Sequence, residues 1–190
     1  IAQTVESARK VAASGVKEVV ITGVNIGDFG KLPDGSSRTD ENLYLLLQEL
    51  LKIQGVERWR ISSIEPNLLT NPIIELAASA QNLAPHFHIP LQSGADKLLK
   101  LMRRKYLAKL YAERVATIKT LMPHACIGVD VIVGFPGETD ELFLQTYNFL
   151  NELDISYLHV FTYSERANTR ALNIEPIVPK NVRKERNKML

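Results

Sequence analysis

Hydrophobic and polar positions along the chain follow two alternating periods. Stretches with apolar residues at every second position are typical of β-strands, and stretches with a period of about 3.6 residues are typical of amphipathic helices. The pattern predicts strands over 17–22, 57–63, 86–91, 127–133 and 156–163. It predicts helices over 1–15, 40–53, 95–103, 107–121 and 139–153, another after Thr70, and a helix-prone basic tail from Pro179. Because strands and helices alternate strictly, we expect an α/β fold with a parallel sheet, either open or part of a β/α barrel.

The two faces of each expected strand differ in chemistry. In the central strand Val129, Val131 and Val133 share one face and Asp130 lies on the other, because side chains alternate with period 2. If the apolar faces pack against helices, the polar faces of several strands point into one space. The side chains expected there are Arg60, Ser62, His88, Gln92, Asp130, His159 and Tyr163. An internal network of Arg, His and Asp would explain any one of them, but for the whole set we favour a wide polar cavity that holds a ligand.

Polar or glycine-containing signatures also follow each expected strand. They are Gly23/Asn25, Ser63/Glu65, Gln92/Ser93, Gly134/Glu138 and Tyr163/Ser164. Ligands of open α/β sheets and of β/α barrels bind at the carboxyl ends of the strands. We therefore expect the functional site at this end.

Composition limits the possible function classes. The 190 residues are 45% hydrophobic, enough for one sizeable core, and the net charge of +2 points to no class of partner. The single cysteine, Cys126, excludes a disulfide framework and is read as a small core residue. No apolar run approaches the roughly 18 residues of a membrane span. The first residues already read as a helix within a domain, so we expect the sequence to begin inside a larger protein.

Six ordered motifs resemble one family. They are Thr22–Gly27, Ser62–Pro66, His86–Gly94, Met102–Tyr106, Asp130–Thr139 and Tyr163–Arg166. Together they resemble the radical S-adenosylmethionine (SAM) methylthiotransferases that modify tRNA. The Ser62–Pro66 stretch is most similar to the branch that acts on N6-threonylcarbamoyladenosine next to the anticodon, and it differs from the isopentenyladenosine branch. The form of Gln92-Ser93-Gly94 differs from that usual in the ribosomal-protein branch.

This resemblance implies a partial (β/α)6 barrel, truncated at its N-terminus so that strands two to six are present. Residues 1–178 would form the incomplete core barrel, and 179–190 a basic linker toward an absent RNA-binding domain. A 4Fe–4S cluster would cleave SAM to a radical that removes hydrogen from adenine C2, and a methylthio group would be added there. A second cluster, a reductant, a sulfur donor and a cytoplasmic location are also implied. The family's three-cysteine motif is absent here. Because a cluster needs several thiolates, we expect none in these residues and no activity from them alone.

The resemblance also implies roles for individual residues. The expected SAM contacts are Gly23, Asn25, Ser63, Glu65, Gln92, Ser93, Arg104, Asp130, Gly134 and Glu138. The expected tRNA contacts are Phe161 and Tyr163, which would stack on a flipped-out base, and Arg166, which would meet the backbone. The basic run Lys97, Lys100, Arg103, Arg104, Lys105 and Lys109 is either a solvated helix surface or a phosphate-binding surface. No catalytic side chain is assigned.

Two alternatives remain at this point. His86 and His88 share a strand face, as in some zinc sites, which would suit a metal-dependent hydrolase barrel, although no third ligand is obvious. The other alternative is a non-catalytic RNA-binding module built on the same barrel.

Overall fold

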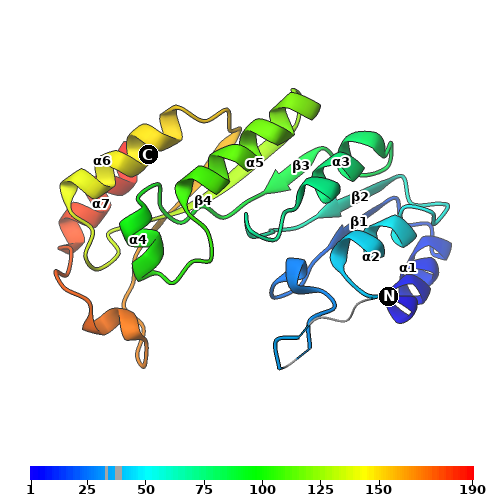
Figure 1. The fold of residues 1–190 in the computed structure, drawn as a ribbon, viewed down its shortest axis with the longest axis horizontal. Coiled ribbons are helices and arrows are strands. Elements are labelled where there is room, and N and C mark those ends of the chain that lie inside the picture. Colours follow the sequence, from blue (N-terminus) through cyan, green and yellow to red (C-terminus); the bar gives the residue numbers. More distant parts are fainter. Residues whose placement is uncertain (33, 37–39) are drawn as a thin grey trace. The chain divides into compact units, whose positions relative to one another are not determined.

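The computed structural model describes residues 1–32, 34–36 and 40–190 (Figure 1). The composition suggested one core, but the described chain forms two compact units. Unit 1 contains residues 1–88 and 117–126, and unit 2 contains residues 89–116 and 127–190. None of the helices in the described ranges has the length and hydrophobicity that crossing a membrane requires.

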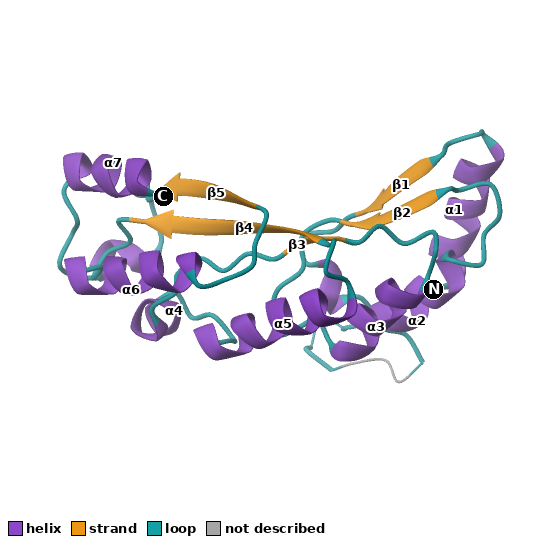
Figure 2. Cartoon of the chain, turned by 90° about the horizontal axis from the view of Figure 1, so that it is seen from above, coloured by secondary structure: helices purple, strands orange, loops and turns teal. Residues whose placement is uncertain are grey.

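Unit 1 is built on a parallel pair of strands. Its elements are α1 (Ala2–Ala13), β1 (Glu18–Ile21), η1 (Ile26–Asp28), α2 (Leu43–Leu50), β2 (Arg58–Ile61), α3 (Asn71–Ser79) and β3 (His86–His88). Strands β1 and β2 pair with Glu18 opposite Arg58 and Ile21 opposite Ile61. Helices α2 and α3 lie on the same side of this pair (Figure 2).

The sequence explains why unit 1 folds in this way. The side chain of Asn42 caps α2 by accepting a hydrogen bond of 2.9 Å from the Leu45 amide. The apolar stripe of α2 (Leu43, Leu46, Leu47 and Leu50) is buried. On β2, Trp59 is buried while Arg60 on the opposite face is only partly covered. The expected alternation of an apolar, helix-covered face and a polar face is therefore confirmed for this strand.

The polar face of the β1–β2 pair carries an exposed ion-pair network. Glu18 accepts hydrogen bonds from Arg60 Nε at 2.9 Å and from Arg58 Nη1 at 3.1 Å. Arg60, which the sequence placed in a ligand cavity, thus has a carboxylate partner inside unit 1. The hydrogen bond from Arg60 is the main reason that the pKa of Glu18 lies below its ordinary value of 4.5.

This network makes a prediction about pH. Because the folded-state pKa of Glu18 is lowered, its contribution to stability is present above pH 4.5 and is lost as the pH falls through the folded-state pKa. We expect Glu18→Gln to reduce the loss of stability on acidification. Urea unfolding between pH 3 and 7, followed by the fluorescence of Trp59, measures this, with Glu6→Gln on the exposed side of α1 as control. Parallel pH profiles for the wild type and Glu18→Gln would contradict the prediction.

Unit 2 contains a second parallel pair. Its elements are α4 (Asp96–Leu101), the first part of α5 (Ala108–Leu121), β4 (Cys126–Val133) from residue 127, α6 (Asp140–Asn151), β5 (Tyr157–Thr162), η2 (Arg170–Asn173) and α7 (Lys180–Met189). Strands β4 and β5 pair with Gly128 opposite Tyr157 and Val133 opposite Thr162. Helices α4 and α6 lie on the same side of β4 (Figure 2). Val129, Val131 and Val133 are fully buried, as the alternating pattern predicts.

The C-terminal segment, for which the sequence predicts a helix-prone basic tail, is a helix that packs within unit 2. Residues 180–189 form α7, and both of its arginines are buried within unit 2. Arg183 donates to the carbonyl of Tyr163 at 2.9 Å and to the carboxylate of Glu165 at 2.6 Å. Arg186 donates to the carboxylate of Glu138 at 2.6 Å. A buried guanidinium must have such partners, so these arginines hold unit 2 together and are not available to a tRNA backbone.

Candidate functional site

A pocket of about 370 Å³ lies at the carboxyl ends of β4 and β5. We call it the β4–β5 pocket, and it is lined by Gln92, Asp130, Ile132, Phe161, Thr162, Tyr163, Ser164, Arg166, Thr169 and Ala171. Asp130 and Ile132 come from the face of β4 opposite the buried valines, and Phe161 comes from the neighbouring strand. The structure therefore brings together two predicted SAM contacts, Gln92 and Asp130, and the three predicted tRNA contacts.

Asp130 is the carboxylate of this pocket. It stands opposite His159 in the β4–β5 register, and its Oδ1 lies 3.1 Å from His159 Nδ1. The His159 side chain is 54% exposed, whereas that of Asp130 is 20% exposed. This contact orients the Asp130 carboxylate.

Gln92 reaches the pocket through a distortion of the chain. The amides of Leu91 and Gln92 both donate to the Asp130 carbonyl, at 3.1 and 2.8 Å, and the Gln92 carbonyl accepts from Ile132 N at 3.0 Å. Two residues thus oppose one, as in a β-bulge, which redirects a side chain. Gln92 has a φ of +71°, a left-handed conformation that non-glycine residues adopt at a cost. Such conformations are concentrated at functional sites.

The two aromatic residues of the pocket are held differently. The Phe161 side chain is 52% exposed, so its ring is accessible to a ligand. The Tyr163 ring packs edge-on against Phe135 at a centroid distance of 5.4 Å, and the Arg183 guanidinium lies 5.3 Å from its centre. The Tyr163 hydroxyl is buried and has no hydrogen-bond partner among the described residues. Phe161 is therefore the better stacking surface, and Tyr163 offers a donor.

The predicted SAM contacts Gly134 and Glu138 lie in a turn held by α7. Glu138 is buried, and its carboxylate accepts hydrogen bonds from Gly134 N at 3.1 Å and from Arg186. Burial raises the pKa of Glu138, against the opposing effect of its hydrogen bonds and Arg186. A Cβ atom on Gly134 would overlap the Arg183 side chain. The Glu138 carboxylate therefore fixes the turn, and contact between this turn and a cofactor stays a prediction.

Two other predicted SAM contacts in unit 2 lie outside the β4–β5 pocket. Ser93 is buried, and its hydroxyl lies 3.0 Å from that of Thr146 and accepts a hydrogen bond from the Ala95 amide at 3.1 Å. It joins the start of α4 to α6. Arg104 lines a different pocket, at the C-terminal end of α4.

The remaining predicted SAM contacts belong to unit 1, at the ends of β1 and β2. Asn25 precedes η1, and its amide donates to Asp28 Oδ2 at 2.7 Å. Ser63 forms a parallel bridge with His88, and the Glu65 carbonyl accepts hydrogen bonds from the amides of the turn that follows. Gly23 lies in the loop after β1. These four residues occupy strand ends as expected, and their role as SAM contacts stays a prediction.

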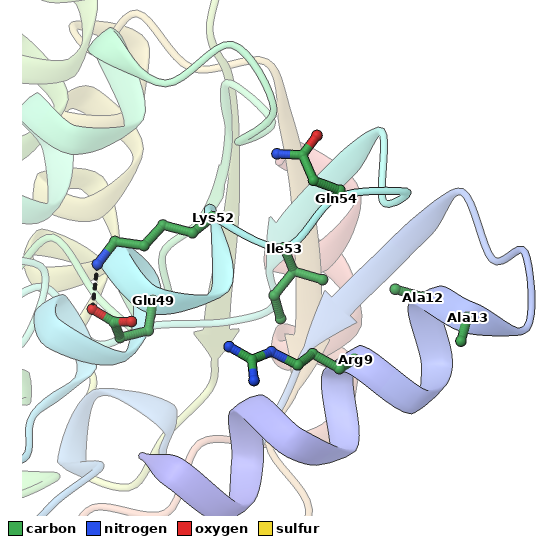
Figure 3. Close-up of a pocket in the computed structure, with 7 residues that line it drawn as sticks. All are labelled: Arg9, Ala12, Ala13, Glu49, Lys52, Ile53 and Gln54. Carbon is green, nitrogen blue, oxygen red and sulfur yellow. Dashed lines mark hydrogen bonds and ion pairs between the residues drawn. The ribbon is translucent and has the colours of Figure 1, made fainter.

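Unit 1 also contains a pocket of about 350 Å³ near the C-terminal ends of α1 and α2 (Figure 3). It is lined by Arg9, Ala12, Ala13, Glu49, Lys52, Ile53 and Gln54. Lys52 is paired with Glu49 across one turn of helix, and Arg9 extends toward this pair from α1 (Figure 3). Because these helix ends lead into the starts of β1 and β2, the pocket lies at the amino ends of the strands. That end of an α/β fold usually serves stability rather than chemistry.

A model of the radical SAM superfamily matches residues 1–150. The chain belongs to the radical SAM superfamily. This agrees with the radical SAM resemblance of the five motifs that lie within residues 1–150, and it disfavours a hydrolase barrel. Among the described residues, the group of three potential metal ligands that contains His88 does not include His86, so the two histidines do not belong to one three-ligand group.

Several relatives of this radical SAM chain are tRNA-modifying enzymes by name. The threonylcarbamoyladenosine tRNA methylthiotransferase MtaB of Bacillus subtilis is 42% identical over 185 residues, which are 97% of this chain and 40% of the relative. MtaB of Aquifex aeolicus is 41% identical, over 98% of this chain and 44% of the relative. The tRNA-2-methylthio-N(6)-dimethylallyladenosine synthase of Acetivibrio thermocellus is 37% identical, over 95% of this chain and 37% of the relative. The chain thus spans about two fifths of the length of these relatives.

Solved radical SAM structures share the fold. The coproporphyrinogen III oxidase HemN of Escherichia coli superposes with a TM-score of 0.68 at 14% identity, covering 98% of this chain and 43% of that one. The cobalamin-dependent S-adenosylmethionine radical enzyme OxsB superposes with a TM-score of 0.62 at 12% identity, covering 89% of this chain and 24% of that one. At such identities the likeness concerns the fold alone, and it confirms the predicted α/β class with parallel sheets.

The residues of this chain do not fit a 4Fe–4S cluster by themselves. Such a cluster is held by several cysteine thiolates, and the sequence has one cysteine, Cys126, half-buried at the first position of β4. No step of the chemistry is therefore assigned to a cluster on these residues.

Proposed function

We propose that this chain is the core part of a radical SAM enzyme that adds a methylthio group to C2 of N6-threonylcarbamoyladenosine next to the anticodon of tRNA. The observation that carries the proposal is the identity of 38–42%, over 97–100% of this chain, with three relatives named for that nucleoside. Five relatives named for dimethylallyladenosine are 36–39% identical. The two branches are close, so the nucleoside itself has to be measured.

The β4–β5 pocket offers groups that suit two nucleosides, that of SAM at Asp130 and Gln92 and the adenosine to be modified at Phe161. It combines a carboxylate at Asp130, an amide at Gln92, an exposed aromatic ring at Phe161 and the buried hydroxyl of Tyr163, which lacks a partner among the described residues. Hydroxyl and amino groups of a nucleoside donate to a carboxylate, and a base stacks on an aromatic ring. When bound, SAM supplies the radical chemistry and the methyl group.

In this proposal the residues of the chain bind and orient SAM and the tRNA. Asp130, held by His159, accepts hydrogen bonds from the ribose or from an amino group, and Gln92 adds a second polar contact. Phe161 stacks on the adenine that is to be modified, and Arg166 meets the adjoining backbone. We further propose two 4Fe–4S clusters on cysteines that these residues do not supply, a reductant and a sulfur donor as partners, and action in the cytoplasm.

Mass spectrometry of tRNA nucleosides tests the proposal. In a strain without the full-length gene, methylthiolated threonylcarbamoyladenosine should disappear and its unmodified precursor should accumulate, and the gene should restore it on a plasmid. Methylthiolated isopentenyladenosine, measured in the same digest, is the internal control and should not change. Loss of that nucleoside instead would assign the chain to the other branch, and unchanged levels of both would overturn the proposal.

A further inference from the structure

A second pocket of unit 2, of about 490 Å³, is markedly basic. We call it the basic pocket, and it is lined by Lys100, Leu101, Met102, Arg103, Arg104, Ile132, Phe135, Arg170, Ala171 and Ile174. Arg170 belongs to η2, whereas the other three cations belong to the C-terminal end of α4 and the residues after it. Among the described residues that line it, none is acidic. An anion is therefore the complementary ligand.

The floor of the basic pocket is apolar and is part of the core. Phe135 belongs to a buried cluster with Ala95, Leu98 and Leu142, against which Ile132 and Ile174 pack. The adjoining turn packs closely on Leu101, because a Cβ atom on Gly137, which has a φ of +84°, would lie 3.2 Å from the Leu101 side chain. The pocket is thus preformed, with charged side chains around a firm apolar base, which suits an anion that carries an apolar group.

Arg103 occupies a backbone position that normally favours glycine. The Arg103 amide donates to the Lys100 carbonyl at 3.0 Å, and the Arg104 amide donates to the Leu99 carbonyl at 2.9 Å, which is the Schellman pattern at the end of α4. Arg103 has the left-handed φ of +58° that this pattern requires. Glycine is the usual residue there because a Cβ is unfavourable in this conformation. Arginine at this position therefore does not stabilise the fold, but its positive charge favours the binding of an anion in the pocket.

We propose that the basic pocket binds a phosphodiester group of an RNA strand, with the adjoining sugar or base against its apolar floor. Arginine binds phosphate oxygens through two parallel hydrogen bonds, and surrounding lysines add charge. Ile132 and Ala171 line both the basic pocket and the β4–β5 pocket. A strand whose base enters the β4–β5 pocket therefore places a neighbouring phosphate in the basic pocket. This inference rests on the proposed function, since the RNA is the tRNA to be modified.

The first test uses Arg103→Gly in the full-length protein. Because glycine suits the left-handed position, the melting temperature should stay the same or rise, while affinity for a synthetic anticodon stem-loop falls. The slope of log affinity against log salt should decrease by about 0.7 for one lost contact to a single strand, which corresponds to about fivefold at 0.1 M relative to 1 M salt. Arg103→Lys keeps the charge and should retain most of the affinity. A stable Arg103→Gly protein with wild-type affinity and salt slope would overturn the proposal.

A charge-matched pair of double variants provides the second test. Lys100→Gln with Arg170→Gln removes two cations from the basic pocket, and Lys97→Gln with Lys109→Gln removes two exposed cations outside it. The first should reduce affinity about 25-fold at 0.1 M relative to 1 M salt, because two contacts are lost, and the second should have little effect. Equal losses would mean that only the overall charge matters, and the proposal would fail.

Two further measurements are needed. One distinguishes a phosphate of RNA from that of a free nucleotide, and the other distinguishes failure of this inference from failure of the proposed function. A stem-loop that lacks the target adenosine should lose the same affinity in the variants, because phosphate contacts carry no sequence information. If the variants instead lost binding of adenosine 5′-monophosphate and kept that of RNA, the pocket would serve a free nucleotide and the proposal would be wrong. If the wild-type enzyme methylthiolated tRNA but Arg103→Gly bound RNA normally, this inference would fail and the proposed function would stand.

Discussion

Replacing Arg186 with methionine should reduce the stability of unit 2 by about 3–5 kcal/mol, the usual cost of removing one partner of a buried ion pair. The Arg186 and Glu138 side chains are 6% and 3% exposed, and their charged atoms lie 2.6 Å apart. Without Arg186, the carboxylate of Glu138 stays buried beside Gly134 with no cation. Native-state hydrogen exchange of the β4 amides should then speed up by about two to four powers of ten.

A matched pair of variants separates this buried pair from the charge of the helix. Lys188→Met removes an exposed cation from the same helix and should leave exchange in β4 unchanged. Combining Arg186→Met with Glu138→Gln should recover much of the loss, because the amide still accepts a hydrogen bond from Gly134 N and no charge remains buried. If Arg186→Met and Lys188→Met behaved alike, the ion pair would not be what holds α7 in place.

The fold was largely predictable because its pattern is local. The central strand has valine at three alternate positions, and the structure buries these three side chains completely. The leucine stripe of α2 is also a local signal, and it is buried as the helical period predicts. Strand ends were less predictable: a strand was expected over 86–91, but β3 covers only His86–His88. The bulge at Gln92 was not predictable either, because it is formed by hydrogen bonds with β4, which lies far away in the sequence.

The role of the tail was not predictable because it depends on distant partners. A segment with this density of lysine and arginine looks the same whether it is solvated or packed. Arg183 and Arg186 can be buried because their guanidinium groups donate hydrogen bonds to the carbonyl of Tyr163 and to the carboxylates of Glu165 and Glu138. These acceptors are far away in the sequence. Periodicity within the tail carries no information about these acceptors. Likewise, nothing in the composition indicates that the described residues form two units.

The candidate site was partly predictable, because part of its lining follows the periodicity of the strands. The period of 2 along β4 and β5 places Asp130, Phe161 and Tyr163 on one face, and all three line the β4–β5 pocket. Thr169 and Ala171 also line it but were missed, because they lie at the start of the short 3-10 helix η2, which is too short to give a periodic signal. The family motif indicated Arg104, yet it could not indicate that Arg170 lines the same basic pocket.

Replacing Asp130 with asparagine should reduce the rate of tRNA methylthiolation by the full-length enzyme about 10- to 150-fold. The range follows from the roughly 1.5–3 kcal/mol that a hydrogen bond to a charged group contributes, since asparagine keeps the shape but loses the charge. The fold should tolerate the change, because the contact to the mostly exposed His159 is worth little. The initial rate at saturating stem-loop RNA, with product measured by mass spectrometry, checks the prediction, and stem-loop affinity should stay within about twofold because Asp130 contacts no phosphate.

His159 provides the control for this prediction, because it touches Asp130 but does not line the β4–β5 pocket. His159→Gln keeps a hydrogen-bond donor toward the carboxylate and should lower the rate only a few fold, through the orientation of Asp130. Asp130→Glu keeps the charge but displaces it by one methylene group, so its rate should lie between those of the wild type and Asp130→Asn. If Asp130→Asn kept the wild-type rate, Asp130 would not be a ligand-binding carboxylate. If His159→Gln were the more damaging change, the imidazole itself would have to act on the substrate.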